Sequence, residues 1–548
     1  MSRLLQDLLA RQAEERADAT ALVLGPTRVS YGELEEESNR LARLLEAAGC
    51  ARGDRVCLFL PKSPEAVISM LAVLKADCAY VPIDLASPAP RVARIVQSAE
   101  PCLALVAAEA LPLVNELLGS GALDRDVAIG TVEPEAVAGP AFESRFSRAD
   151  WSAFDPTPPP RANVPDDLAH ILFTSGSTGM PKGVMITHRN VLHFVDWATA
   201  YFGMRPGDRI SGHPPLHFDL STFDIFGAFH AGAELHLVPP QANLLPTRLA
   251  DLIRSAELTQ WFSVPSAMTL MAAFGVVQPG AFPSLERVLW CGEVLPTPVL
   301  QKWMDAVPQA RFTNLYGPTE ATIASSYYTV PARPASETEP IPIGTPCPGE
   351  ELLVLDDDLR PVPPGEVGSL YIAGVGLSPG YWRDAERTQE AFVPDPRSPE
   401  GGTLIYRTGD LARMDEDGLV YFLGRADSQI KSRGYRIELG EIESALNAID
   451  EVSESAVVGV ETDRFEGVSI CCAYALAPGA SLEPPALRER LRTQLPAYML
   501  PAAWLRLETL PKNVNGKIDR RLIRDLFAAR APEADASEAG ADMAAHAR

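Results

Sequence analysis

The stretch Ile171-Leu-Phe-Thr-Ser-Gly-Ser-Thr-Gly-Met-Pro-Lys-Gly-Val184 joins a short apolar run to a loop rich in glycine and hydroxyl side chains. The run Ile171–Phe173 is typical of a buried strand. Between Thr174 and Gly183 stand three glycines, two serines, two threonines and one lysine. Glycines let the backbone approach a polyanion closely, and successive backbone N–H groups form a concave anion-binding site. The loop is therefore predicted to bind phosphate groups.

This loop differs from the P-loop of many nucleotide-binding proteins. A P-loop carries Gly-Lys-Ser/Thr and leads directly into a helix. Here Pro181 precedes Lys182 and disfavours a helical conformation at Met180. Val184–Thr187 then alternates weakly and predicts a second strand. A strand–loop–strand unit argues against a P-loop kinase and leaves a flexible surface hairpin as the alternative.

The string Thr-Ser-Gly-Ser-Thr-Gly-x-Pro-Lys-Gly at residues 174–183 resembles the phosphate loop of the adenylate-forming superfamily. That superfamily includes nonribosomal peptide synthetase adenylation domains, acyl-CoA synthetases and luciferases. Further strings resemble motifs of the family in the family's order, from about residue 10 to 526. They are Asn314–Glu320, Tyr406–Leu411, Gly424–Glu443 and Asn515–Arg520. The resemblance implies a stand-alone amino acid adenylation domain of the nonribosomal peptide synthetase type.

The composition narrows the possible partners and location. The 548-residue chain has a formal net charge of −24, whereas nucleic-acid binding needs clustered Lys and Arg, so no nucleic-acid partner is expected. Met1–Arg16 predicts an amphipathic helix rather than a signal peptide. Apolar runs are too short to cross a membrane, so no membrane partner is expected. The eight scattered cysteines indicate reduced thiols in a cytoplasmic protein.

Helical and strand patterns alternate along residues 1 to about 150. Ser30 predicts a capped helix, Val56–Leu60 a buried strand, and Ser63 the cap of a further helix. Asn190–Phe202 predicts another helix. Such alternation predicts an α/β fold with mainly parallel sheets. The resemblance adds a small, mobile C-terminal α+β domain. The expected parts are a large AMP-binding domain at 1–424, a hinge at 425–427, a small domain at 428–526 and a disordered tail at 527–548.

Asp219 stands in the apolar string His217-Phe-Asp-Leu-Ser-Thr-Phe-Asp-Ile-Phe226. A carboxylate in such surroundings is costly unless paired, so Asp219 either caps the next helix or binds a cation. The matching Asp of amino-acid-activating relatives binds the α-ammonium group. The pocket that the resemblance implies has no other charge in its walls, which predicts a small-to-medium neutral amino acid. Its residues are Asp219, Leu220, Phe223, Ser263, Leu289, Cys291, Leu315, Ile323 and Ala324.

A nucleotide site is expected beside this pocket. Tyr316 can stack on a purine, Asn314 can bond its edge, and Glu320 can ligate Mg²⁺ through oxygen. Asp410, predicted at the end of a strand, would take the ribose hydroxyls, and Arg425 the ribose or a phosphate. By the resemblance the nucleotide-binding residues are Thr174, Ser175, Gly176, Ser177, Thr178, Gly179, Gly292, Glu293, Asn314, Tyr316, Gly317, Asp410, Phe422 and Arg425.

The resemblance implies ATP and Mg²⁺ as the groups required for catalysis, and four catalytic residues: Lys182, Thr319, Glu320 and Lys517. Lys517 would enter the active site, and Asp427 would be the hinge. The substrate carboxylate would attack the α-phosphate of ATP and form an aminoacyl-AMP. No Leu-Gly-Gly-x-Ser string follows Lys517, so the phosphopantetheine thiol of a separate carrier protein is the expected acceptor.

Two alternatives to this function stay open. The first is an acyl-CoA or aryl-acid ligase of the same superfamily, which has no ammonium group to bind. The second is a non-catalytic relative that binds only a nucleotide or a carrier protein.

Overall fold

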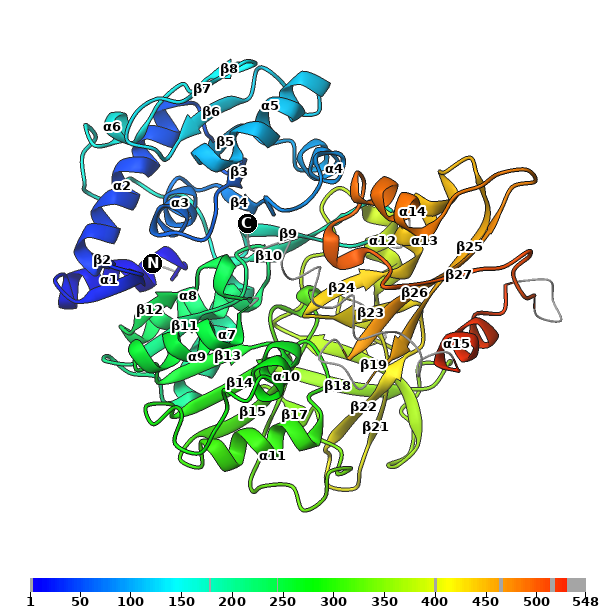
Figure 1. The fold of residues 1–548 in the computed structure, drawn as a ribbon. Coiled ribbons are helices and arrows are strands. Elements are labelled where there is room, and N and C mark those ends of the chain that lie inside the picture. Colours follow the sequence, from blue (N-terminus) through cyan, green and yellow to red (C-terminus); the bar gives the residue numbers. More distant parts are fainter. Residues whose placement is uncertain are drawn as a thin grey trace. The chain divides into compact units, whose positions relative to one another are not determined.

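The computed structural model describes residues 3–176, 179–243, 245–398, 402–462, 467–512 and 518–529. It divides into two compact units, coloured from blue to yellow and from yellow to red in Figure 1. The larger unit contains the described chain up to Asp427 except Gly176–Met180, together with Arg433–Tyr435. The smaller unit contains the remainder. Within these described ranges, no helix combines the length and apolar character needed to cross a bilayer.

A nine-stranded sheet carries most of the predicted site. Its order is β17-β16-β15-β14-β13-β11-β12-β1-β2, and the six strands from β15 to β1 run parallel. Because the carboxyl ends of parallel strands meet at one edge, Gly212, Ser263, Cys291 and Tyr316 lie along the same edge. The bounds are β1 (Thr20–Leu24), β2 (Thr27–Ser30), β11 (Arg209–Gly212), β12 (Glu234–Leu237), β13 (Gln260–Ser263), β14 (Arg287–Cys291), β15 (Arg311–Tyr316), β16 (Ser326–Thr329) and β17 (Thr345–Pro346).

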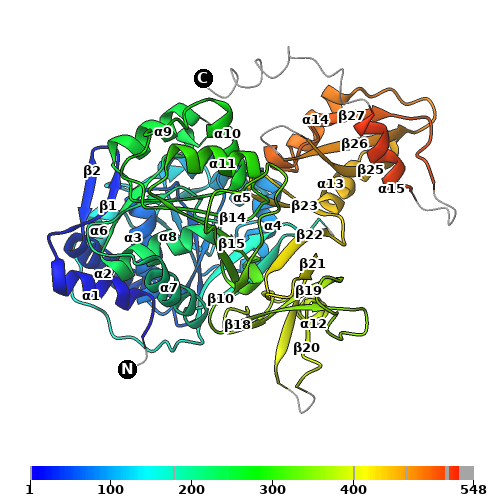
Figure 2. The ribbon, with the colours of Figure 1, turned by 90° about the horizontal axis from the view of Figure 1, so that it is seen from below.

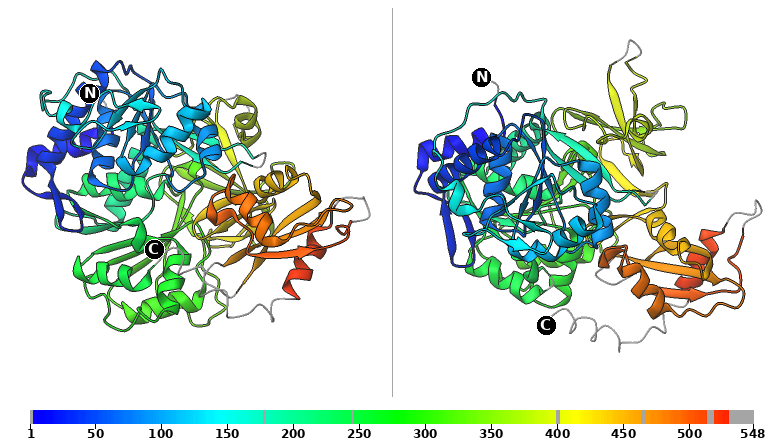
Figure 3. Two further views of the ribbon diagram at one scale, coloured as in Figure 1. Left: turned by 45° about the horizontal axis from the view of Figure 1, so that its top comes forward. Right: turned by 90° about the horizontal axis from the view of Figure 1, so that it is seen from above.

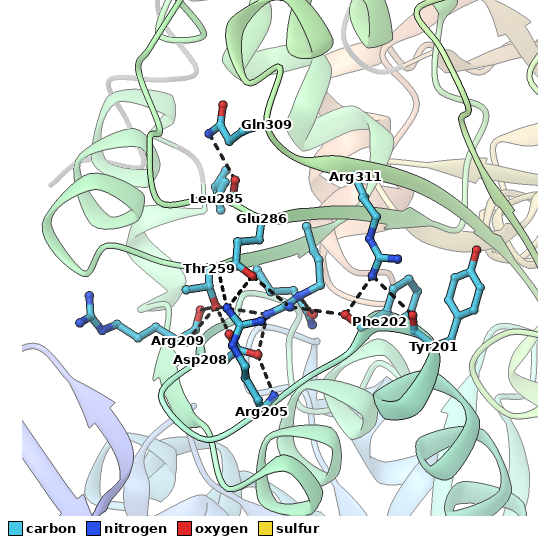
Figure 4. Close-up of polar contacts among 12 residues, drawn as sticks. Tyr201, Phe202, Arg205, Asp208, Arg209, Thr259, Leu285, Glu286, Gln309 and Arg311 are labelled. Atoms are coloured by element: carbon cyan, nitrogen blue, oxygen red, sulfur yellow. Dashed lines mark hydrogen bonds and ion pairs between the residues drawn. The ribbon is translucent and has the colours of Figure 1, made fainter.

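The opposite, amino-terminal edge of this sheet is fixed by a buried ion pair. Asp208 and Arg287 lie 2.7 Å apart with side chains 1% and 3% exposed. Thr259 donates a hydrogen bond of 3.2 Å to Asp208 Oδ1, and Arg287 donates one of 3.1 Å to Gln260 Oε1. Figure 4 shows these contacts with the exposed pair Arg205–Glu286 beside them. The network therefore joins the starts of β11, β13 and β14.

A six-stranded sheet contains the phosphate-loop hairpin. Its order is β10-β9-β4-β3-β5-β6, parallel except for β10. The two strands around the loop pair antiparallel, with Lys182 opposite Thr174, so the predicted strand–loop–strand unit is present. The bounds are β3 (Arg55–Phe59), β4 (Ala79–Pro82), β5 (Leu103–Val106), β6 (Ala128–Thr131), β9 (Leu168–Thr174) and β10 (Lys182–Thr187).

The helices of the larger unit begin where the sequence places capping residues. Ser30 and Ser63 each accept a backbone N–H, and Thr187 caps a helix that begins at His188, two residues before the predicted start at Asn190. Figure 2 shows α9, α10 and α11 side by side. The bounds are α1 (Gln6–Arg16), α2 (Tyr31–Ala47), α3 (Pro64–Lys75), α4 (Ala89–Ala99), α5 (Leu111–Ser120), α6 (Arg148–Trp151), α7 (His188–Phe202), α8 (Leu220–Ala231), α9 (Pro246–Ser255), α10 (Pro265–Ala273) and α11 (Thr297–Ala306), with short 3₁₀ turns η1 (Ala108–Ala110), η2 (Pro240–Ala242) and η3 (Thr319–Ala321).

An antiparallel sheet completes the larger unit, with β22 paired to β21. The prediction that a strand ends at Asp410 is wrong. Pairing with β22 continues to Met414, across an irregularity between Leu411 and Ala412. The bounds are β18 (Glu350–Leu355), β19 (Val367–Gly374), β20 (Phe392–Pro394), β21 (Leu404–Met414), β22 (Val420–Arg425) and α12 (Ala385–Ala391), with a separate hairpin of β7 (Ala138–Gly139) and β8 (Phe142–Glu143).

The smaller unit packs helices on a three-stranded sheet. Figure 3 shows α15, in red, alongside the orange strands, where Ile523 and Phe527 join an apolar cluster with Val458 and Cys471. Phe527 is thus helical although the sequence assigns it to the tail; the predicted tail from residue 530 lies outside the described residues. The predicted fold class is confirmed. The bounds are β23 (Gln429–Ser432), β24 (Tyr435–Glu438), α13 (Leu439–Asn447), β25 (Val452–Glu461), β26 (Val468–Leu476), α14 (Pro484–Arg492), η4 (Ala497–Met499), β27 (Ala503–Arg506) and α15 (Arg520–Ala528).

Candidate active site

The loop between β9 and β10 turns at Gly179. This residue has φ of +79° and donates its backbone N–H to Gly176 O at 2.9 Å. At the end of β9, Thr174 Oγ1 is buried and has no hydrogen-bond partner among the described residues. Buried hydroxyls are normally hydrogen-bonded, so Thr174 is suited to receive a polar ligand. Ser177 and Thr178, also predicted to bind phosphate, lie outside the described residues.

Lys182 begins β10 and lies beside a buried carboxylate. Its Nζ is 3.4 Å from Glu320 Oε1 and 3.5 Å from the hydroxyl of Tyr381. The Tyr381 hydroxyl in turn donates a 2.7 Å hydrogen bond to Glu320 Oε1. Two predicted catalytic residues, 138 positions apart in the numbering, are therefore in contact. Tyr381 could not be selected from its sequence neighbours, because it follows an ordinary Pro-Gly pair.

Glu320 is the residue that could hold a magnesium ion. Its side chain is completely buried next to a lysine. Within the described ranges, no group of three or more His, Cys, Asp or Glu side chains could hold a metal. Mg²⁺ is commonly bound by one or two carboxylates together with substrate phosphates. A single buried carboxylate beside Lys182, which the sequence predicts to bind phosphate, fits that pattern.

A chain of hydrogen bonds links the predicted nucleotide residues of three strands. The Tyr316 hydroxyl, at the end of β15, donates to Asp410 Oδ2 in β21. Arg425, at the end of β22, donates to Asp410 Oδ1 at 2.6 Å. Arg425 also makes two 2.7 Å hydrogen bonds to Asp427, the predicted hinge residue. Burial and the nearby Asp410 carboxylate raise the pKa of Tyr316 well above its usual value, so its hydroxyl remains a donor.

Four other predicted nucleotide-binding residues lie in the larger unit. Asn314 lies within β15, not in a turn, and donates to Pro342 O at 2.8 Å. Phe422 is packed against the apolar cluster that contains Tyr316. Gly292 has φ of +99°, and Glu293 Oε2 accepts the Ser266 N–H at 2.9 Å.

The turn that contains Thr319 and Glu320 is tightly constrained. A Cβ added at Gly317 would lie 2.6 Å from the Cα of Ala324, so only glycine fits. Thr322 and Ile323 have φ of +54° and +71°, which is unfavourable for β-branched residues. The Thr322 hydroxyl donates a 2.7 Å hydrogen bond to Gly376 O, which helps to hold this conformation. Half-buried Thr319 opens η3.

Asp219 directly precedes α8 and is 8% exposed. Its side chain makes no capping hydrogen bond to the helix, so the capping alternative is not supported. The positive end of a helix dipole favours an anion at this position. Ser263 is also buried, at the end of β13. The apolar residues predicted for the pocket belong to one continuous core cluster: Leu220, Phe223, Leu289, Cys291, Leu315, Ile323 and Ala324.

Contacts between different elements hold these pocket residues together. Phe223 in α8 packs edge-on against Phe194 and Phe262, with ring centroids 5.3 and 5.9 Å away. Strand register places Leu289 beside Phe262 and Cys291 beside Leu315. Lys517, predicted to bond the substrate carboxylate, lies outside the described residues.

Family models cover most of the chain. The model described as AMP-binding enzyme matches residues 9–382, and that of the AMP-binding enzyme C-terminal domain matches residues 441–517. The chain belongs to the AMP-binding enzyme family. The predicted family and enzyme class, an adenylate-forming ligase, are confirmed.

The relatives include both single enzymes and large synthases. The chain is 35% identical to the L-proline--[L-prolyl-carrier protein] ligase of Streptomyces coelicolor, over 94% of this chain and 95% of that protein. It is also 35% identical to tyrocidine synthase 2 of Brevibacillus parabrevis, where it spans 95% of this chain but only 13% of the synthase. The solved adenylation domain AlmE of Vibrio cholerae, in complex with glycyl-adenosine-5'-phosphate, matches with a TM-score of 0.83 and 25% identity, over 96% of this chain and 98% of AlmE.

Proposed function

We propose that this enzyme activates a small-to-medium neutral amino acid with ATP and passes the aminoacyl group to a separate carrier protein. The observation that carries the proposal is the buried Asp219 carboxylate, which precedes α8 without capping it. This carboxylate would form a charge-assisted hydrogen bond with the cationic α-ammonium group of the substrate. The proline ligase relative, named for loading a carrier protein, supports the second half of the proposal.

In the proposed first step, a substrate carboxylate oxygen attacks the α-phosphorus of ATP and pyrophosphate leaves. Asp219 would hold the ammonium group, and the apolar walls would position the side chain. Lys182 and the Thr174 hydroxyl would bind phosphate oxygens through charge and hydrogen bonds. Glu320 would hold Mg²⁺, which neutralises phosphate charge when bound. Positioning and electrostatic stabilisation carry such a reaction, since no covalent protein intermediate is needed.

Tyr381 and the Asp410 pair complete this arrangement. Tyr381 donates to Glu320 and touches Lys182, so it would keep both side chains oriented. Asp410 is held by Tyr316 and Arg425 and would accept hydrogen bonds from the ribose hydroxyls. By the family resemblance, Lys517 would bond the substrate carboxylate and α-phosphate.

In the proposed second step, the phosphopantetheine thiolate of the carrier attacks the aminoacyl carbonyl carbon and AMP leaves. A rotation about Asp427 would withdraw Lys517 before this transfer. The domain limits at residues 424 and 427 are part of the same proposal. We place the reaction in the cytoplasm, in keeping with eight cysteines that are all free thiols.

Amino-acid-dependent ATP–pyrophosphate exchange tests the proposal. The panel should contain proteinogenic amino acids, D-amino acids and matched carboxylic acids without an amino group. We expect exchange with one or a few neutral amino acids, and a loss of about 100-fold or more in Asp219→Ala, because a buried ion pair with the substrate is removed. Exchange only with acids lacking the amino group would favour the acyl or aryl ligase. No exchange with any acid would favour the non-catalytic alternative.

A further inference from the structure

A buried lysine joins the two parallel sheets of the larger unit. Lys62 lies between β3 and α3 and is 7% exposed. Its Nζ donates hydrogen bonds of 2.8 Å to Gly212 O and 2.6 Å to His213 O. Gly212 is the last residue of β11 in the other sheet. Burial lowers the pKa of Lys62 to about 7, and a buried amine needs hydrogen-bond partners, which these two carbonyls supply.

The chain that Lys62 holds leads directly to Asp219. From Gly212 it runs through Pro214 and Pro215 to the start of α8. Proline has no backbone N–H to donate, so Pro214 and Pro215 cannot donate backbone hydrogen bonds that would hold this connection in place. Besides Lys62, its first residues are held by the Val238 N–H, which donates to Gly212 O at 3.1 Å.

The helix after Asp219 contains a buried carboxylate, Asp224, whose pKa is affected by the charge of Lys62. Asp224 in α8 is 1% exposed, and within the described ranges neither of its oxygens has a side-chain hydrogen-bond partner. Burial raises the pKa of Asp224 well above its usual value, and the positive charge of Lys62 opposes that shift. Asp224 lies four residues after Leu220, so both share one face of the helix. Lys62 therefore makes hydrogen bonds to the connection before the predicted pocket. Its charge also acts on a carboxylate of α8, the helix predicted to line that pocket.

We propose that Lys62 is a positioning residue for amino-acid recognition, because its Nζ hydrogen bonds fix the start of the Gly212–Asp219 connection and thereby the carboxylate that receives the substrate amino group. This inference rests on the proposed function. The alternative is a lysine that only stabilises the fold.

Lys75 provides a matched control for that alternative. It is also a buried lysine of the larger unit, 5% exposed. Its Nζ bonds to Ser38 and Asn39 at 2.8 and 2.7 Å and pairs with Glu35 at 2.7 Å. These contacts lie between α2 and α3 and include no predicted pocket residue. Lys75→Met should therefore lower stability without affecting amino-group recognition.

The first readout is discrimination between the amino acid and its matched acid without the amino group. It is the ratio of the two kcat/KM values in pyrophosphate exchange. Lys62→Met should lower this ratio about tenfold or more, because small displacements of a binding group are costly. Lys75→Met should leave it within about twofold, and Lys62→Arg should restore part of it. Equal losses with both substrates in Lys62→Met would overturn the inference.

The second readout does not depend on activity. Hydrogen–deuterium exchange of the peptide covering residues 211–221 should become faster in Lys62→Met and stay unchanged in Lys75→Met. If Lys62→Met does not fold, Lys62→Gln keeps a shorter donor and serves in its place. An unchanged rate of hydrogen–deuterium exchange in this peptide would overturn the positioning role of Lys62 and leave the proposed function intact. Wild-type activity only with acids lacking an amino group would instead overturn the proposed function, and with it the recognition role.

Discussion

Glu350 lies beneath the strained turn of Thr322 and Ile323, where it meets a histidine. Its Oε1 accepts the Gly376 N–H at 2.8 Å and is 3.4 Å from His193 Nε2. A small cavity is lined by Glu350, His193, Thr322 and Ala324, among others. The pair thus supports the backbone that carries two predicted pocket residues, Ile323 and Ala324.

This pair predicts a pH-dependent contribution to stability. The Glu350 carboxylate raises the pKa of His193 above 6.5. The stabilisation is therefore complete below the unfolded-state pKa and is lost as pH rises through the raised, folded-state pKa. We expect His193→Gln to lower the free energy of unfolding more at pH 5.5 than at pH 8.5, by up to about 1 kcal/mol. Urea denaturation at both pH values measures the difference, and equal losses would contradict it.

The starts of the parallel strands provide a second prediction. Breaking a buried ion pair leaves an uncompensated charge and costs about 3–5 kcal/mol. Asp208→Asn, which removes the partner of Arg287, should lower the free energy of unfolding by about that amount. Asp305→Asn, which breaks the exposed pair with Arg333, should cost less than about 1 kcal/mol. Similar melting temperatures for the two variants would argue against the assigned role of the buried pair.

Local sequence signals predicted the elements better than the contacts between them. Ser63 and Ser30 mark helix starts because a cap acts on the next turn, and the glycine loop was predictable because its residues are contiguous. Lys62 bonds a residue 150 positions away, and Lys182 touches Tyr381 across 199. Only the folded sheets bring such pairs together, so composition and spacing could not reveal them. Asp410 was placed at a strand end, whereas pairing with β22, which places Arg425 opposite Asp410, continues β21 to Met414.

At the scale of the whole molecule, the predicted binding and catalytic residues lie on both sides of the predicted hinge in the sequence. Asp219, Glu320 and Asp410 belong to the larger unit, and Lys517 follows the hinge in sequence. If Lys517 acts only in adenylation, its removal should separate the two half-reactions. Lys517→Gln should slow pyrophosphate exchange by about 100-fold or more, as for the loss of one group that stabilises transition-state charge. Transfer from supplied aminoacyl-AMP to a carrier should change by no more than a few-fold.

That comparison needs a control for general damage to the smaller unit. Lys512→Gln disrupts an exposed pair with Glu454 and should leave both half-reactions near wild type. Equal slowing of adenylation and transfer in Lys517→Gln would contradict the assigned division of labour.

The contact between Lys62 and the connection before Asp219 also bears on how this enzyme could be recombined. Most of the predicted pocket falls in one continuous segment from Asp219 to Ala324, which is convenient for grafting from a relative with another substrate. In such a chimera Lys62 would still come from this enzyme, whereas residue 224 would come from the donor. A donor segment with an apolar residue at position 224 would remove the carboxylate that opposes the lowering of the Lys62 pKa, and would leave the buried amine more readily neutral. Chimeras should therefore exchange the turn between β3 and α3 together with the pocket segment, or take the segment from a donor with an acidic residue at position 224.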